Sequence, residues 1–156
     1  MKAILLGDSC VGKSTLLTCI RDNQNVIPTI GVDCVMYNDL QVWDTSGHRR
    51  FKRVIEVFYP KMDTFVFVYR DLESLASIEN IRREVMSSKK RPARYLLVYN
   101  GKDKEIRFQG KMYAMMYNFK FVQGDLSIKK HSKRVMDIIE KCTKTPPNGW
   151  RYCWFY

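Results

Sequence analysis

A phosphate-binding loop is the first stretch of the chain with recognisable chemistry. Its residues, Gly7-Asp8-Ser9-Cys10-Val11-Gly12-Lys13-Ser14, fit the pattern G-x-x-x-x-G-K-[ST] and are followed by Thr15. In such a loop the backbone N–H groups face phosphate oxygens, and glycine stands where a Cβ would collide or where φ turns positive. Lys13 then reaches the β- and γ-phosphates, and the Ser14 hydroxyl binds Mg²⁺. The loop and Thr15 therefore predict a nucleotide phosphate site.

Two later segments carry groups that suit the same site. A predicted strand ends at Trp43 and runs directly into Asp44-Thr45-Ser46-Gly47, where a carboxylate can hold Mg²⁺ through water. Gly47 allows its backbone N–H to approach a γ-phosphate. Thr29 lies on a loop and offers a second hydroxyl to the metal. We therefore predict a magnesium site formed by Ser14, Thr29 and Asp44.

Alternating apolar strands and amphipathic helices must position these groups. We expect strands at residues 2–6, 32–36, 40–43, 64–69, 95–99 and, at an edge, 120–122; helices are expected at residues 16–20, 74–86, 109–117 and 127–141. This alternation favours an α/β fold with a doubly wound sheet, helices on both faces and the ligand at the carboxyl edge of the strands.

The motifs together resemble those of a Ras-like small GTPase, and the chain is most similar to the Rab branch. The resemblance is carried by Gly7 to Ser14, Pro28 to Asp33 and Trp43 to Gly47, and it extends over essentially the whole chain. It implies a P-loop NTPase fold with a mostly parallel six-stranded sheet of order 2-3-1-4-5-6, in which strand 2 alone is antiparallel. It also implies binding of GTP or GDP with Mg²⁺, hydrolysis of GTP, and a role in membrane trafficking.

The resemblance assigns roles to individual residues. Lys13 binds the phosphates and stabilises charge during hydrolysis, Ser14, Thr29 and Asp44 hold the metal, and Gly47 contacts the γ-phosphate. Switch loops at residues 26–33 and 44–60 contact effector and regulator proteins. The family's water-orienting glutamine is replaced by His48. Either this imidazole orients the attacking water, as a histidine does in translational GTPases, or it is an inert loop residue in a slow enzyme.

Base recognition departs from the family pattern. The motif Asn-Lys-x-Asp appears as Asn100-Gly101-Lys102-Asp103, without its lysine. Asp103 can still accept the guanine N1 and N2 hydrogens, and the stem of Lys102 would cover the base if it swung inward. The backbone N–H of Gly124 could reach the guanine O6. We expect guanine to be preferred over adenine, with weaker affinity than is usual in the family.

Composition and the last residues indicate the domain organisation and the localisation of the protein. The 156 residues predict one GTPase domain at 1–145 and a short tail at 146–156 that packs on it. Five cysteines without metal spacing favour a reducing cytoplasm. The net charge of +11 and several basic clusters favour peripheral contact with an acidic membrane, whereas no RNA-binding signature is present. Cys153 begins an atypical C-a-a-X ending, and a packed aromatic tail is the favoured alternative to prenylation.

These features predict a compact Rab-like GTPase that switches between GTP- and GDP-bound states and hydrolyses GTP slowly by itself. One alternative is a nucleotide-loaded Rab mimic that binds a cellular partner without significant hydrolysis. Another is a P-loop phosphotransferase, which the segment from Trp43 to Gly47 disfavours. The shortened loops would suit a viral or otherwise reduced genome.

Overall fold

A single six-stranded sheet organises the chain in the computed structural model, which describes residues 1–20, 29–88 and 91–146. The strands are β1 (Lys2–Leu6), β2 (Val32–Tyr37), β3 (Leu40–Thr45), β4 (Thr64–Tyr69), β5 (Arg94–Asn100) and β6 (Lys120–Gly124). Their order is β2-β3-β1-β4-β5-β6, and only the β2–β3 pair is antiparallel within the described residues. The predicted sheet order and the predicted edge position of residues 120–122 are therefore confirmed.

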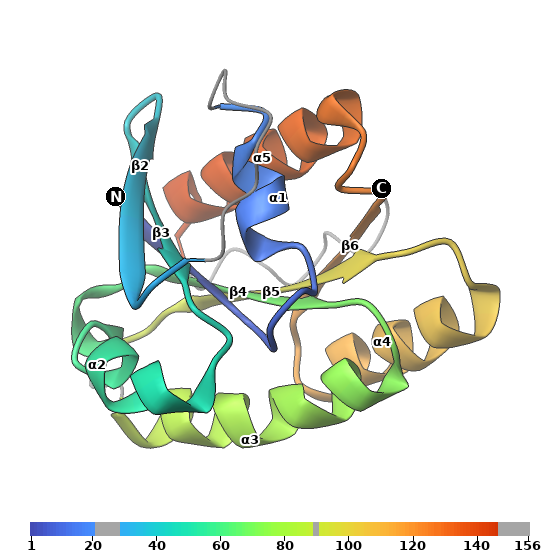
Figure 1. The fold of residues 1–156 in the computed structure, drawn as a ribbon, viewed down its shortest axis with the longest axis horizontal. Coiled ribbons are helices and arrows are strands. Elements are labelled where there is room, and N and C mark those ends of the chain that lie inside the picture. The colour runs from blue at the N-terminus through green and yellow to red at the C-terminus, as the bar shows by residue number, and fades with distance from the viewer. Residues whose placement is uncertain (21–28, 89–90, 147–156) are drawn as a thin grey trace.

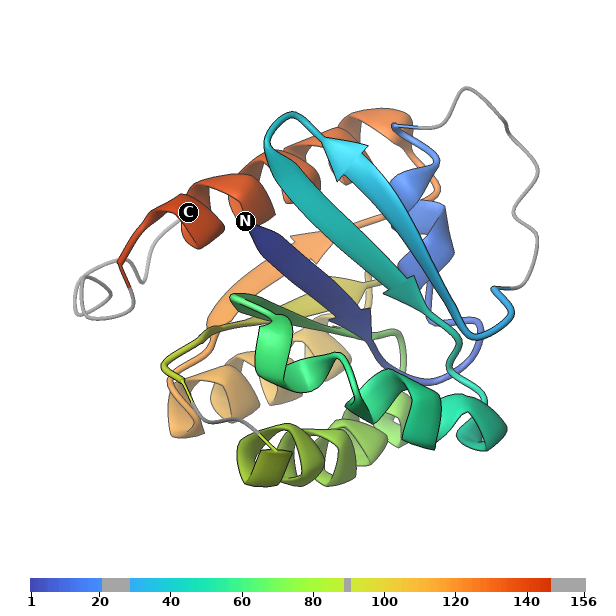
Figure 2. The ribbon, with the colours of Figure 1, turned by 90° about the vertical axis from the view of Figure 1, so that its left-hand side faces the viewer.

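Helices cover both faces of the sheet. They are α1 (Lys13–Leu17), α2 (Lys52–Glu56), α3 (Leu72–Ser88), α4 (Lys104–Met116) and α5 (Lys129–Lys144), with 3₁₀ turns η1 (Arg49–Phe51) and η2 (Tyr59–Lys61). Figures 1 and 2 show α1 and α5 on one face and α2, α3 and α4 on the other. The predicted doubly wound α/β fold is confirmed.

Each face of the sheet has its own apolar core. Leu5, Val66 and Val98 point to the cluster shared with α1 and α5, whereas Phe65 and Phe67 point to the cluster beneath α3 and α4. All six residues of β4 are buried because helices cover both of its faces. The site at the carboxyl edge of these strands thus rests on a rigid central layer.

Several predicted bounds were wrong. The helix expected at residues 16–20 begins at Lys13, and the one expected at 109–117 begins at Lys104, because the Asp103 side chain caps it. The helical turns between residues 49 and 61 were not predicted, since each is too short to show a 3.6-residue period. The structure holds them through the burial of Ile55 and Tyr59.

Some predictions lie outside the described residues. They concern the first part of the switch loop at residues 26–28, the basic pair at 89–90, and the tail from 147 to 156, including Cys153. Among the residues that are described, no helix combines the length and apolarity needed to cross a bilayer.

Candidate functional site: the phosphate loop and its switch residues

The phosphate loop joins β1 to α1 and turns through unusual backbone conformations. Gly7 and Gly12 have φ values of 145° and 105°, which L residues with a side chain rarely adopt. A Cβ on Gly12 would also lie 2.4 Å from Nδ2 of Asn100. Cys10 adopts a left-handed φ of 62° at an exposed position. The glycines of the motif are thus required by both conformation and space.

Lys13 is buried at the start of α1 and folds back over the loop. Its ammonium donates to the carbonyl oxygens of Gly7 at 2.8 Å and Asp8 at 2.6 Å. Burial lowers the pKa of Lys13 to about 8, although the carboxylates of Asp44 and Asp8 favour its charged form. The ammonium is therefore held beside the backbone that would face the phosphates, in a setting that an added anion would stabilise.

The three predicted metal ligands converge at one point. Ser14 Oγ donates to Asp44 Oδ2 at 2.5 Å, Thr29 Oγ1 donates to the same oxygen at 2.6 Å, and the two hydroxyl oxygens are 2.9 Å apart. Ser14 comes from α1, Thr29 from the segment before β2, and Asp44 from the end of β3. The fold therefore brings together side chains up to thirty residues apart in the chain.

Asp44 gives the observation that tests whether a metal fits. Its side chain is fully buried, and Oδ1 is one of two buried side-chain polar atoms without a hydrogen-bond partner in the described part of the chain. A buried carboxylate oxygen is costly unless it is paired or coordinates a cation. One carboxylate with two hydroxyls, rather than a cage of acidic residues, suits Mg²⁺ held jointly with phosphate oxygens. The residues present fit this ion.

Gly47 and His48 lie against the phosphate loop. A Cβ on Gly47 would stand 2.2 Å from the Ser9 backbone nitrogen and 2.3 Å from the Asp8 carbonyl carbon, so only glycine fits. Two hollows, each of about 560 Å³, meet there and share Asp8, Gly47 and His48 in their lining. The switch segment after β3 is therefore in direct contact with the loop, as a γ-phosphate contact would require.

His48 is exposed, and its backbone N–H donates to Ser46 Oγ at 3.3 Å. Within the described residues, no hydrogen bond orients its imidazole. Arg49 lines both hollows beside it, whereas the guanidinium of Arg50 lies over the Phe51 ring, 4.6 Å from the centroid. The side chain that stands in place of the family's glutamine thus lines both hollows, and no hydrogen bond among the described residues fixes its orientation.

The base-recognition segment follows β5. The Asn100 amide donates to the Val11 carbonyl at 2.9 Å, and its oxygen accepts from the Leu126 backbone at 3.0 Å. Asn100 therefore clamps the phosphate loop to the loop after β6. Gly124, at the end of β6, pairs with Asn100 in the sheet register. The sequence motif includes Asn100 but does not reveal that its side chain links these two loops.

Lys102 forms an ion pair in this structure, whereas Asp103 caps a helix. Lys102 Nζ lies 2.9 Å from Asp125 Oδ2 and is 79% exposed, so its stem does not stand in the inward position considered from the sequence. Hydrogen bonds from Ser127 and Lys102 lower the pKa of Asp125 to about 2. Asp103 Oδ1 accepts from the backbone of Glu105 and Ile106, at 2.8 and 3.0 Å, and so caps α4. Sequence reasoning missed both the ion pair and the cap.

Comparisons with known proteins agree with this geometry. The Ras family model matches residues 2–146. The chain is 28% identical to Ras-related protein Rab-15 of Rattus norvegicus, over 97% of this chain and 82% of the relative. It is 33% identical to Ras-related protein SEC4 of Candida albicans, over 80% and 68%. The match to Ras-related protein Rab-1C of Dictyostelium discoideum is 37% identical over 53% and 46%.

These relatives favour a hydrolysing switch over the nucleotide-loaded mimic and over the phosphotransferase. Members of the family bind guanine nucleotides with Mg²⁺ and act through effector and regulator proteins. The chain belongs to the Ras family and is a Rab-like small GTPase, a switch between GTP- and GDP-bound states that hydrolyses GTP.

Proposed function

We propose that residues 7–15 bind the phosphates of GTP or GDP, that Ser14, Thr29 and Asp44 hold Mg²⁺, and that hydrolysis is slow without a partner. The convergence of these three side chains around a buried Asp44 oxygen without a partner carries the proposal. The GTPase domain corresponds to residues 1–145, in line with the extent of the family match.

Each group has a distinct chemical task. When bound, Mg²⁺ would neutralise negative charge on the phosphate oxygens, which favours transfer of the γ-phosphoryl group to water. Lys13 leaves its carbonyl partners for the phosphate oxygens and offers charge in a water-poor setting, where it is worth more than at the surface. The Gly47 backbone N–H contacts the γ-phosphate, and its missing side chain permits that approach.

Slow hydrolysis follows from the unfixed His48 imidazole. A group that places an attacking water contributes strongly only when its own orientation is set, and this ring has no orienting partner among the described residues. We expect His48→Ala to change the single-turnover rate by less than about threefold, whereas His48→Gln raises it. A tenfold loss in His48→Ala would show instead that the imidazole places the water. Arg50→Ala is a matched control on the same segment, because Arg50 lies over the Phe51 ring and lines neither hollow.

The bound nucleotide tests the whole proposal. The freshly purified protein is denatured, the released nucleotide is identified by ion-exchange chromatography, and its replacement by labelled GTP and ATP is followed. We expect GDP or GTP, exchange with GTP, and no exchange with ATP, because Asp103 accepts hydrogens that guanine has and adenine lacks. A protein that is empty or indifferent to the base would overturn the proposal.

Partner proteins have an exposed apolar surface to bind on the switch segments. Ile30 is 79% exposed, and Val54 and Val57 on and beside α2 are 51% and 65% exposed. Ile30 follows the metal-binding Thr29, and Val57 follows the segment that carries Gly47, so their positions depend on the nucleotide site. We assign effector and regulator contacts to residues 29–33 and 44–60. The presence or absence of the γ-phosphate would change the position of these segments and so change partner binding.

A cytoplasmic protein with peripheral membrane contact is the localisation that the surface supports, and no nucleic acid partner is expected. The outward side of α4 carries an apolar line of Phe108, Met112 and Met115, which are 55%, 47% and 56% exposed. Lys104 and Lys111 are exposed beside it. Apolar side chains flanked by lysine on one helix face match the interface of an anionic bilayer, as does the net charge of +11.

Co-sedimentation with vesicles tests this contact. The protein should bind phosphatidylcholine vesicles that contain phosphatidylserine and should not bind phosphatidylcholine alone. Lys104→Glu with Lys111→Glu, and separately Phe108→Ser, should each reduce the bound fraction at least threefold, because charge and insertion act together. The control is Lys129→Glu with Lys130→Glu on α5, which makes the same charge change elsewhere. Equal losses in both charge variants would reject α4 as the contact.

A further inference from the structure

Gly101 stands where the resemblance predicts a lysine, and the structure shows why no side chain is present. A Cβ at this position would lie 2.6, 2.7 and 2.8 Å from the hydroxyl, Cζ and Cε2 atoms of Tyr99. The φ angle of Gly101 is not in the positive region, so the constraint is space rather than backbone conformation. The loss of the lysine is therefore tied to the presence of Tyr99.

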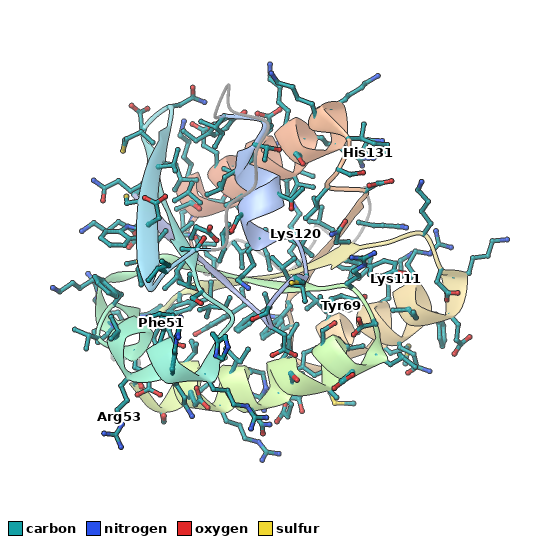
Figure 3. All side chains as sticks on the ribbon, in the orientation of Figure 1. Phe51, Arg53, Tyr69, Lys111, Lys120 and His131 are labelled. Carbon is teal, nitrogen blue, oxygen red and sulfur yellow. The ribbon has the colours of Figure 1, made fainter. Side chains whose placement is uncertain are left out.

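Tyr99 is held rigidly at the end of β5. Its side chain is 1% exposed, and its ring stacks on that of Tyr69, with centroids 5.0 Å apart and an interplanar angle of 24°. Figure 3 shows Tyr69 between the sheet and the helices that cover this face. Burial raises the pKa of the Tyr99 hydroxyl, which thus stays protonated at neutral pH. A fixed neutral hydroxyl is therefore presented to the turn that follows.

That hydroxyl contacts the residue expected to read guanine. Tyr99 Oη accepts a hydrogen bond from the Asp103 backbone N–H at 3.1 Å. The Asp103 carboxylate in turn accepts from the first turn of α4 through Oδ1. The backbone of Asp103 is thus fixed from the sheet, and its side chain from the helix. These contacts determine the direction in which the carboxylate can face a base.

Lys102 does not perform this task. Its ammonium pairs with Asp125 at 2.9 Å, and its side chain is 79% exposed. This ion pair joins the loop after β5 to the loop after β6. It does not involve the side chain of Asp103. Tyr99 of β5 therefore contacts the Asp103 backbone directly, whereas Gln123 of β6 donates to the Gly101 carbonyl of the same turn at 3.0 Å.

We propose that Tyr99 is a positioning residue for guanine recognition and that its ring fills the space in which a side chain at position 101 would begin. The inference rests on the proposed function, in which Asp103 accepts the N1 and N2 hydrogens of guanine. The Tyr99 hydroxyl holds the Asp103 turn in the orientation that makes both contacts. The tyrosine ring occupies the space from which a side chain at position 101 would start.

The ratio of affinities for GDP and inosine diphosphate measures this role, because inosine lacks only the 2-amino group that Asp103 reads. Tyr99→Phe keeps the ring and removes the hydroxyl. We expect it to weaken GDP binding about threefold to tenfold and to reduce the preference for GDP over inosine diphosphate. Tyr69→Phe is the matched control, since its hydroxyl contacts the Ile106 carbonyl at 3.4 Å rather than Asp103. Its ratio should equal that of the unmodified protein.

A second pair of variants tests the exchange of space. Gly101→Lys alone should lose GDP affinity and lower the unfolding temperature, because its Cβ meets the Tyr99 ring. Tyr99→Gly combined with Gly101→Lys removes that clash, and we expect it to bind GDP more tightly than Gly101→Lys alone. Independent, additive effects of the two changes would contradict the coupling.

The outcomes separate the inference from the function beneath it. If the unmodified protein prefers GDP over inosine diphosphate and Tyr99→Phe keeps the same ratio, the inference is overturned while the proposed function stands. If the unmodified protein shows no preference among GDP, inosine diphosphate and ADP, the proposed guanine recognition itself is wrong, and Tyr99 has nothing to position.

Discussion

Thr29 Oγ1 lies 2.6 Å from Asp44 Oδ2 and donates a hydrogen bond to it, which joins the segment before β2 to the end of β3. The same carboxylate oxygen accepts from Ser14, so the start of the switch region, the sheet and the phosphate loop meet at one atom. A cation placed there would replace hydrogen bonds by ligand bonds to the same side chains. Such a cation would couple the position of Thr29 to the metal and, through it, to the γ-phosphate.

Thr29→Ala should weaken binding of a GTP analogue in the presence of Mg²⁺. One ligand bond to the metal is lost, and we expect release of the slowly hydrolysed analogue GTPγS to become about tenfold to hundredfold faster. Release measured in EDTA should be fast for both proteins and nearly equal, because the contact acts through the metal. Thr18→Ala is the control, since that hydroxyl donates to the Thr15 carbonyl within α1. Equal acceleration with and without Mg²⁺ would contradict the assignment of Thr29 as a ligand.

Nucleotide affinity should fall as the pH rises above neutrality because of Lys13. Burial lowers the pKa of its ammonium to about 8 in the absence of nucleotide. Phosphate charge beside the ammonium raises this pKa, so binding takes up a proton, and by linkage the affinity falls from about pH 8 up to the pKa of the complex. We expect GDP affinity to drop by up to about tenfold per pH unit in this range.

The control for that pH dependence is Lys13→Arg. A guanidinium stays charged throughout the range, so the slope should disappear even though the affinity itself is lower. Titration of GDP at intervals between pH 7 and 9.5 with both proteins gives the comparison. The same slope in Lys13→Arg would assign the titration to another group.

The sequence predicted the strands and the contiguous motifs better than the turns between them. Residues 2–6 and 64–69 were predicted with the observed bounds because uninterrupted apolar runs mark strands that are buried on both faces. The helical turns after Gly47 depend instead on tertiary contacts. An example is the 2.6 Å ion pair between Lys52 of α2 and Glu84 of α3, which local periodicity does not reveal.

The site shows the same division between local and distant information. The phosphate loop can be recognised in the sequence because its chemistry requires fixed residue types at adjacent positions. The hold of Tyr99 on Asp103, and the space it takes from position 101, appear only when the ring is placed against the turn. The sequence shows only that a lysine is missing from the motif. The structure shows that the ring of Tyr99, two residues earlier, occupies the space that a Cβ at position 101 would need.

Asp103→Asn should change base preference without unfolding α4. Asparagine caps a helix about as well as aspartate, so the unfolding temperature should stay within about 3 °C. The amide can no longer accept both hydrogens of guanine, and we expect GDP affinity to fall about tenfold to hundredfold. Xanthosine diphosphate, whose C2 carbonyl accepts from the new amide N–H, should lose little affinity or gain some. Parallel losses for the two nucleotides would indicate that Asp103 supports the loop but does not read the base.

Gly47→Ala should impair hydrolysis much more than it impairs GDP binding. The new Cβ would meet the Ser9 nitrogen and Asp8 carbonyl at 2.2 to 2.6 Å, and backbone atoms of the phosphate loop cannot move aside as a flexible side chain would. The switch segment must therefore retreat and withdraw its N–H from the γ-phosphate.

Loss of one positioned donor costs about a hundredfold in rate, which we expect in single-turnover hydrolysis of GTP by this variant. Its GDP affinity should stay within about threefold, since GDP has no γ-phosphate for that N–H to contact. Arg50→Ala, three residues later, lies outside both hollows and should hydrolyse GTP at the unmodified rate. If Gly47→Ala instead lost GDP binding and GTP hydrolysis in equal measure, the contact between the switch segment and the loop would serve to hold the loop itself, and the γ-phosphate role of Gly47 would have to be withdrawn.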